Sequence, residues 1–170
     1  MSVSNIETER LILMPMTHKM MHTLIENNTD EVTKLGLQLH EKWPRQDTLD
    51  ILWFLKDLIK SDEDISGFDI WMVIKKDGMQ IIGDAGFKGK PDDDGKIEIG
   101  FGLVDDEQKK GYGLEAARGL MDWASQQQGV KTILAECLLD NVGSIKVLTR
   151  CGMTETRRDH EYIYWEKHVR

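Results

Sequence analysis

The chain has 170 residues, of which 40% are hydrophobic and 31% are charged, a balance typical of a folded globular protein and not of a disordered or fibrous one. Its 22 basic and 30 acidic side chains give a formal net charge of −8, which argues against non-specific nucleic-acid binding, because such binding requires basic surface. The sequence has no apolar run near the ~20 residues of a membrane span, and its first residues do not resemble a signal peptide. We therefore expect one domain over residues 1–170, located in the cytoplasm, with neither a membrane nor a nucleic acid as partner.

The first third of the chain predicts one strand and two helices. Residues 10–14 favour a strand. Thr17 is a suitable N-cap for a helix whose apolar residues follow at helical spacing. Asp47 or Thr48 is expected to cap a second helix, with apolar residues spaced along 49–59. The segment between the two helices has no clear pattern.

The middle of the chain predicts a hairpin. Residues 68–74 and 79–87 favour strands, and a Lys-Asp-Gly turn at 76–78 separates them. The acidic run at 92–95 is expected to be a solvated loop, because calcium ligation would need a longer loop with spaced ligands.

Residues 96–104 predict a strand with two different faces. Alternation places Ile97, Ile99, Phe101 and Leu103 on one face and Glu98, Gly100, Gly102 and Val104 on the other. The elements expected after it are a helix over 111–128, a strand over 131–139, a helix capped by Asp140 or Asn141, and a last strand over 161–165. This order of elements predicts an α/β layered domain with a mixed sheet.

The cysteines and histidines do not form a metal motif. Cys137 and Cys151 have no paired spacing and are expected to be buried, reduced thiols. His18 and His22 lie four residues apart on a predicted helix but have no third ligand, so a solvated helix face is the better interpretation. We expect no metal.

Residues 108–114 carry the sharpest local signal, since they lie between a predicted strand and a predicted helix. The first amides of a helix have no internal partner, and the helix dipole adds partial positive charge there. Gly111 and Gly113 allow a ligand to approach the backbone, and Lys109 and Lys110 add charge. These features predict a site for a phosphate or pyrophosphate, although the P-loop and dinucleotide motifs are not matched. A glycine-rich turn without a ligand is the open alternative.

Residues 97–153 resemble the core of the GCN5-related N-acetyltransferases, the GNAT superfamily. The family's signature is Gln/Arg-x-x-Gly-x-Gly/Ala between a strand and a helix, and an asparagine with a small residue three positions later follows the next strand. These motifs are matched here by Gln108, Gly111, Gly113, Asn141 and Ser144. Residues 7–13 are similar to the start of the RimJ/RimL-type subgroup, whose members modify protein N-termini, amino acids and small amines.

The resemblance implies an α/β domain of the GNAT type, with a mixed, mostly antiparallel central sheet that is splayed at the acyl-CoA site and flanked by helices. It also implies an N-acetyltransferase that moves an acetyl group from acetyl-CoA, its co-substrate, to a primary amine in a ternary complex. The acceptor is a protein N-terminus, an amino acid or another small amine, and a homodimer is left open. Two alternatives remain, namely a non-catalytic CoA-binding or sensing module and a binding protein with this fold but without the coenzyme.

The family's coenzyme contacts carry over to matching positions. The strand before the signature loop, which is expected to carry a bulge, binds the pantetheine arm through its backbone, and the loop amides hold the pyrophosphate. The residues implied are Phe101, Leu103, Val104, Gln108, Lys109, Lys110, Gly111, Tyr112, Gly113, Leu114, Asn141 and Ser144.

Acetyl transfer to an amine needs a proton acceptor, because an alkyl amine with a pKa of ~10 is mostly protonated at neutral pH. Glu98 is the candidate base, since it shares a strand face with Gly100 and Gly102 and related enzymes place a glutamate near this position. A surface carboxylate or a structural ion pair is the alternative for Glu98. Glu136, on the next predicted strand, is a second candidate base.

The acid side of the reaction departs from the family pattern. Leu148 stands where many members have a tyrosine that acts as an acid. The resemblance to the RimL-like branch implies that Ser144 would instead hydrogen-bond the sulfur, with a helix-packing serine as the alternative. Trp43, Trp53 and Trp71 are candidates for the acceptor pocket, with core packing as the alternative.

Overall fold

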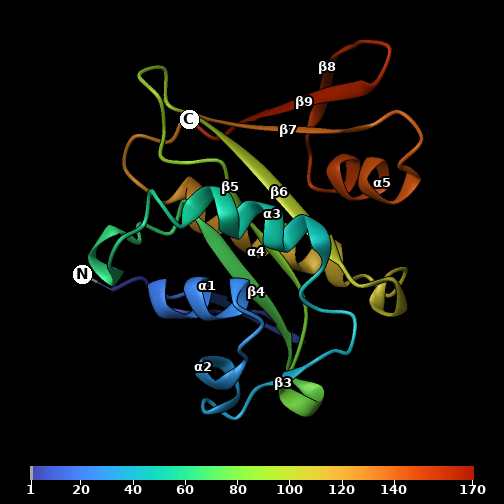
Figure 1. Ribbon diagram of the computed structural model, residues 1–170. Coiled ribbons are helices and arrows are strands. Elements are labelled where there is room, and N and C mark those ends of the chain that lie inside the picture. Colours follow the sequence, from blue (N-terminus) through green and yellow to red (C-terminus); the bar gives the residue numbers. More distant parts are fainter. Residues whose placement is uncertain (1) are drawn as a thin grey trace.

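The computed structural model describes residues 2–170 and contains a sheet with helices on both faces (Figure 1). The strands are β1 (Ile6–Glu7), β2 (Leu11–Pro15), β3 (Gln38–Leu39), β4 (Ile70–Lys75), β5 (Gln80–Phe87), β6 (Lys96–Leu103), β7 (Thr132–Leu138), β8 (Thr154–Arg158) and β9 (Tyr162–His168). The α-helices are α1 (His18–Ile25), α2 (Asp30–Thr33), α3 (Gln46–Leu55), α4 (Tyr112–Ser125) and α5 (Val142–Arg150). Short 3-10 turns are η1 (Asp62–Asp64), η2 (Asp77–Met79) and η3 (Asp105–Glu107). No helix within residues 2–170 is both long enough and apolar enough to cross a membrane.

The sheet order is β1-β2-β4-β5-β6-β7-β9-β8, and β3 lies beside β5. All neighbouring pairs are antiparallel except β6 with β7 and β3 with β5. The predicted mixed, mostly antiparallel sheet flanked by helices is therefore confirmed. The predicted hairpin is also present, as β4 and β5. The expected bulge in the central strand is absent from the pairing of β6 with β5, which keeps one register throughout.

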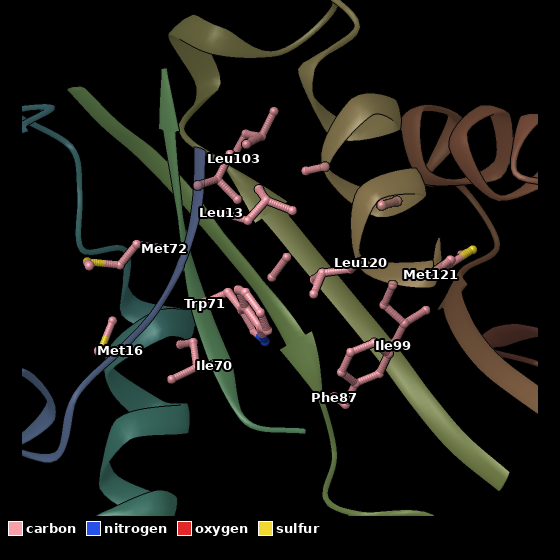
Figure 2. Packing of buried hydrophobic residues seen from close by; sticks show 14 of the residues in the cluster. Leu13, Met16, Ile70, Trp71, Met72, Phe87, Ile99, Leu103, Leu120 and Met121 are labelled. Carbon is pink, nitrogen blue, oxygen red and sulfur yellow. The ribbon is translucent and has the colours of Figure 1, made fainter. Parts of the chain in front are cut away.

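The hydrophobic core continues through both faces of the sheet. Alternation along β4 sends Trp71 toward α4, where its ring lies 5.4 Å from the ring of Trp123, and sends Ile70 and Met72 toward the opposite side (Figure 2). Trp71 and Met72 are fully buried, and burying a side chain of this size contributes about 2 kcal/mol to folding. Packing against the two faces of the sheet positions α3 and α4, which border the candidate site.

Local capping signals were informative for α1 and α5 but wrong for α3. Thr17 caps α1 as predicted, since its hydroxyl accepts a hydrogen bond from the Met20 amide at 3.2 Å. In contrast, α3 begins at Gln46 after Arg45 and has no side-chain cap. The Thr48 hydroxyl instead donates to the buried Asp84 carboxylate on β5, so a tertiary contact overrides the local preference. The helix also ends at Leu55, earlier than predicted.

Several short elements were not predicted. The unassigned segment between the first two predicted helices contains α2 and β3, and the chain ends contribute β1 and β8. The helix predicted over 111–128 ends three residues earlier, at Ser125. Cys137 and Cys151 are buried and not disulfide-bonded, as predicted, and burial raises the pKa of the Cys151 thiol.

Candidate functional site

Strands β6 and β7 diverge along their length, and the opening between them is the centre of the candidate site (Figure 1). Their parallel pairing covers Lys96–Glu98 of β6 and then stops, while β6 stays paired to β5 and β7 stays paired to β9. A cavity of about 260 Å³, called here the splay cavity, lies in this gap. The splayed sheet that the family resemblance implied is therefore present. Four predicted site residues line the splay cavity: Glu98, Phe101, Asn141 and Ser144.

The backbone of β6 presents a free edge to the gap. In an antiparallel pair, alternate residues direct both their N–H and their C=O groups toward the same neighbour. The Val104 amide donates to the Ile82 carbonyl of β5 at 2.9 Å, so the alternation turns the backbone groups of Phe101 and Leu103 toward β7. Phe101 is thus placed to pair with an extended ligand in the gap, as a further strand would.

Two predicted contacts at the end of β6 are already engaged within the protein. The Leu103 carbonyl accepts a hydrogen bond from the Gln108 side chain at 3.0 Å, and the Gln108 amide donates to Asp105. The Val104 amide and carbonyl both have partners, because the carbonyl accepts from the Glu107 amide at 3.0 Å. Gln108 shapes the loop, and the contact of Val104 with the coenzyme stays a prediction.

The loop before α4 has the backbone conformation that an anion site requires. Lys109 and Gly111 have φ values of 64° and 85°, in the left-handed region where glycine is favoured. Gly111 is the N-cap of α4 and provides no side chain to cap it. The amides of Tyr112, Gly113 and Leu114 precede the first intrahelical hydrogen bonds and point out of the helix end. These groups fit a pyrophosphate in charge and in hydrogen bonding.

Arg10 of the N-terminal region holds the loop in place. Its guanidinium pairs with Glu115 of α4 at 2.8 Å, donates to the Lys110 carbonyl at 2.9 Å, and lies 4.3 Å from the centre of the Tyr112 ring. Burial alone would raise the pKa of Glu115, but hydrogen bonds from Thr8 and Arg10 outweigh it and lower that pKa. This contact was not predicted, because it links residues more than one hundred positions apart.

An ion-pair cluster occupies the vertex where β6 and β7 separate. The Lys88 ammonium contacts the Glu98 carboxylate and lies 3.5 Å from the Glu136 carboxylate. Burial lowers the pKa of Lys88, but the two carboxylates raise it by more, so the pKa lies above its usual value. The structure thus brings together both carboxylates that the sequence offered as bases, and adds a lysine that it did not.

The start of α5 forms the opposite wall of the splay cavity. The Asn141 side chain accepts a hydrogen bond from the Ser144 amide at 3.1 Å and caps the helix, as predicted. Leu148 is buried in the same wall, so no acid stands at that position. A phenol instead reaches the cavity from β9, where Tyr162 lies opposite Leu138 of β7. Tyr162 was not a predicted site residue, because its place beside the cavity depends on the pairing of β7 with β9.

A second cavity of about 1000 Å³ lies between α3 and the sheet. We call it the helix-side cavity. It shares Lys88, Gly100 and Phe101 with the splay cavity, so the two spaces meet at β6. Gly100 has open space where a Cβ would lie, which keeps the junction clear.

The helix-side cavity is apolar inside and acidic at its edge. Three of its apolar side chains are exposed to solvent by 43%, 71% and 61%: Ile51, Phe54 and Leu58. Four exposed carboxylates also line it: Asp47, Asp50, Glu63 and Asp64. This combination suits a ligand that has both an apolar part and a positive charge.

The tryptophans offered for the acceptor pocket lie elsewhere. Trp71 packs in the core, Trp43 is 3% exposed, and Trp53 is 56% exposed on α3, beside Lys56. The lining of the helix-side cavity includes none of the three.

Asp84 of β5 is a buried carboxyl group in the lining of this cavity. It accepts hydrogen bonds from the Trp43 indole at 3.0 Å and from the Thr48 hydroxyl, and an Arg45 guanidinium nitrogen lies 3.7 Å away. Burial raises the pKa of Asp84, although these hydrogen bonds and Arg45 oppose the shift. The contacts join the segment before α3 to the sheet and so position one wall of the cavity.

We expect Asp84→Ala to lower the free energy of unfolding by about 2 kcal/mol, because it leaves buried donors on Trp43 and Thr48 without an acceptor. Asp47→Ala is the matched control, since Asp47 contacts the same Arg45 at 3.6 Å but its side chain is 80% exposed. That variant should change stability by less than about 0.5 kcal/mol. Urea denaturation measures both, and equal losses would contradict the role assigned to the buried contacts.

The structure offers no metal cluster in its described part. Within residues 2–170, no group of three or more His, Cys, Asp or Glu side chains is arranged to hold a metal ion. His18 and His22 lie side by side on α1, with ring centres 4.4 Å apart.

Comparisons with known proteins agree with this geometry. The sequence matches the family described as Acetyltransferase (GNAT) domain over residues 10–154. It is 33% identical over 160 residues to the uncharacterized N-acetyltransferase YjdG of Bacillus subtilis (strain 168), over 94% of this chain and 95% of that protein. The fold is similar to that of the ribosomal-protein-S5-alanine acetyltransferase from Vibrio fischeri, with a TM-score of 0.70 and 17% identity over 98% and 97% of the two chains. It is also similar to RimL, a ribosomal L7/L12 alpha-N-protein acetyltransferase in complex with coenzyme A, with a TM-score of 0.67 and 14% identity over 97% and 98%.

Proposed function

The chain belongs to the Acetyltransferase (GNAT) domain family, and from this premise we propose that it transfers an acetyl group from acetyl-CoA to a primary amine. The proposal rests on one observation, namely that the splay cavity and the helix-side cavity both contact Gly100 and Phe101. A donor in the splay cavity and an acceptor in the helix-side cavity would approach one point from separate sides. Holding both reactants at one point favours direct transfer in a ternary complex.

The donor side follows the order of chemical groups along acetyl-CoA. The loop amides at 112–114, with Lys109 and Lys110 nearby, lie past the end of β6 and would hold the pyrophosphate. The free backbone edge at Phe101 would pair with the amide-bearing arm. Glu98 lies at the vertex, about 17 Å along the strand from Leu103, where the thioester would arrive. A structural neighbour solved with coenzyme A supports this co-substrate.

The reacting centre would need a proton acceptor and a hydrogen-bond donor. We assign the first role to Glu98, which lines the splay cavity and would take the proton of the acceptor ammonium, directly or through water. Ser144 and Tyr162 line the same cavity and are the candidates that would donate to the departing sulfur. Because a thioester is already activated, positioning by these walls would supply much of the rate.

The acceptor side supports an amine with an apolar body. The exposed apolar side chains at 51, 54 and 58 would bind that body, and the carboxylates around them would attract its charge. Two structural neighbours named as ribosomal-protein acetyltransferases support a RimJ/RimL-like enzyme, for which a protein N-terminus is one such acceptor. The free thiols of Cys137 and Cys151 support a reducing compartment such as the cytoplasm.

Two measurements, made one after the other, test the proposed function. Acetyl-CoA at about 100 times its Kd should add about 2.7 kcal/mol of stability and raise the melting temperature by about 5–10 °C. Release of free CoA should then be followed across peptides, amino acids and small amines. No thermal shift would contradict the coenzyme site. A shift without transfer to any amine would favour the alternative of a CoA-binding or sensing module.

A further inference from the structure

Lys88 lies at the junction of the two cavities. It follows the last residue of β5, and it lines both the splay cavity and the helix-side cavity. Its ammonium reaches the carboxylates of Glu98 on β6 and Glu136 on β7. A positive charge therefore already stands at the point where the amine acceptor would meet the donor.

The lysine is the exposed member of this cluster. Its side chain is 62% exposed, whereas those of Glu98 and Glu136 are 28% and 33% exposed. The carboxylates belong to paired strands, whereas the ammonium sits on a flexible four-carbon stem. Because the lysine end of this cluster is largely exposed and its stem is flexible, Lys88 can leave the carboxylates for solvent.

The two carboxylates share one cation. Like charges that share a site disfavour each other's ionisation. Within residues 2–170, Lys88 is the one basic side chain that forms an ion pair with either carboxylate. If Lys88 leaves, a second ammonium group can take the same position beside the two carboxylates.

We propose that Glu98 and Glu136 form a binding site for a primary ammonium group, that Lys88 occupies this site in the free protein, and that the acceptor's ammonium displaces Lys88 when it binds. The inference rests on the proposed function, and it deepens that function by naming the group that the site selects. The exchange replaces one ammonium by another, so each carboxylate keeps a charged partner throughout. Lys88 is then a specificity-determining residue, because only a ligand that brings its own cation can take its place between the two carboxylates.

The test measures binding to the CoA-saturated protein without turnover. The probes are 2-phenylethylamine, which has an apolar body and a primary ammonium, and 2-phenylethanol, which has the same body without the charge. In Lys88→Met the stem keeps its apolar bulk but loses its charge. Isothermal titration should show the amine binding about fivefold more tightly than to the wild type, the gain expected when a partly exposed competing ion pair is removed. Binding of the alcohol should not change.

Two further variants separate competition from a structural role. Lys88→Arg keeps a cation between the carboxylates, so its affinity for the amine should stay near that of the wild type. Lys88→Met with Glu136→Gln should lose the gain, because one carboxylate of the site is gone. Lys88→Gln replaces Lys88→Met if the latter does not fold, as judged by thermal unfolding.

Three results would overturn the inference. They are unchanged or weaker amine binding in Lys88→Met, an equal gain for the alcohol, and mass-spectrometric detection of acetyl-Lys88, which would make the lysine an acceptor and not a competitor. Failure of the wild type to bind coenzyme A would instead count against the proposed function. Normal coenzyme A binding with unchanged amine affinity would count against the role of Lys88 alone.

Discussion

A Gly111→Val variant is expected to lose at least ~100-fold in its affinity for coenzyme A while it still folds. Gly111 has a φ of 85°, which a β-branched residue adopts only with strain. A Cβ at this position would also lie 3.1 Å from an Arg10 guanidinium nitrogen. Relief of the strain would turn the amides at the start of α4 away from their common direction. Isothermal titration with coenzyme A measures the loss.

Gly78→Val is the matched control for this experiment. Gly78 has nearly the same φ, 79°, and a Cβ there meets nothing within 4 Å. It lies in the η2 turn between β4 and β5, away from the loop before α4. Both variants should lose stability through backbone strain, but Gly78→Val should bind coenzyme A as the wild type does. Normal binding by Gly111→Val would show that the loop is not the phosphate site.

Glu98→Gln is expected to lower kcat by about 100-fold while coenzyme A affinity stays unchanged. The amide keeps the size of the side chain but cannot take a proton from the acceptor. Steady-state kinetics would measure kcat, and isothermal titration with coenzyme A would measure the affinity.

Glu136→Gln serves as the comparison, since Glu136 lines the same cavity and contacts the same lysine. If Glu98 is the base and both carboxylates bind the ammonium, Glu136→Gln should raise KM for the amine and leave kcat nearly unchanged. A larger loss of kcat in Glu136→Gln would transfer the role of base to Glu136. Unchanged kinetics in Glu98→Gln would exclude Glu98.

The parts of the site that the sequence predicted depend on neighbours in the chain. The alternation over 96–104, the glycines at 111 and 113 and the cap at Asn141 are all short-range signals, and each element lies where they indicated. A cap or a glycine turn acts within a few residues, so its outcome can be read without the rest of the fold.

The missed parts depend on contacts between distant segments. Thr48 and Asp84 are 36 positions apart. The Thr48 hydroxyl donates to the Asp84 carboxylate and does not cap the helix, and the sequence of the helix does not contain that acceptor. Tyr162 enters the splay cavity through the register of β7 with β9. The register of β5 with β6 likewise brings Lys88 beside Glu98. A pattern in one strand does not contain the register of its neighbour.

The limited pairing of β6 with β7 has a consequence for cooperativity. Backbone hydrogen bonding links the two parts of the sheet at one end of the gap, and core packing joins them elsewhere. We therefore expect β7, β8, β9 and α5 to open as a unit more easily than the sheet from β1 to β6. A ligand that bridges the gap would bind the closed arrangement alone and would couple this unit to the rest of the molecule. A substrate bound in the gap between β6 and β7 would therefore also stabilise the contact between the two regions.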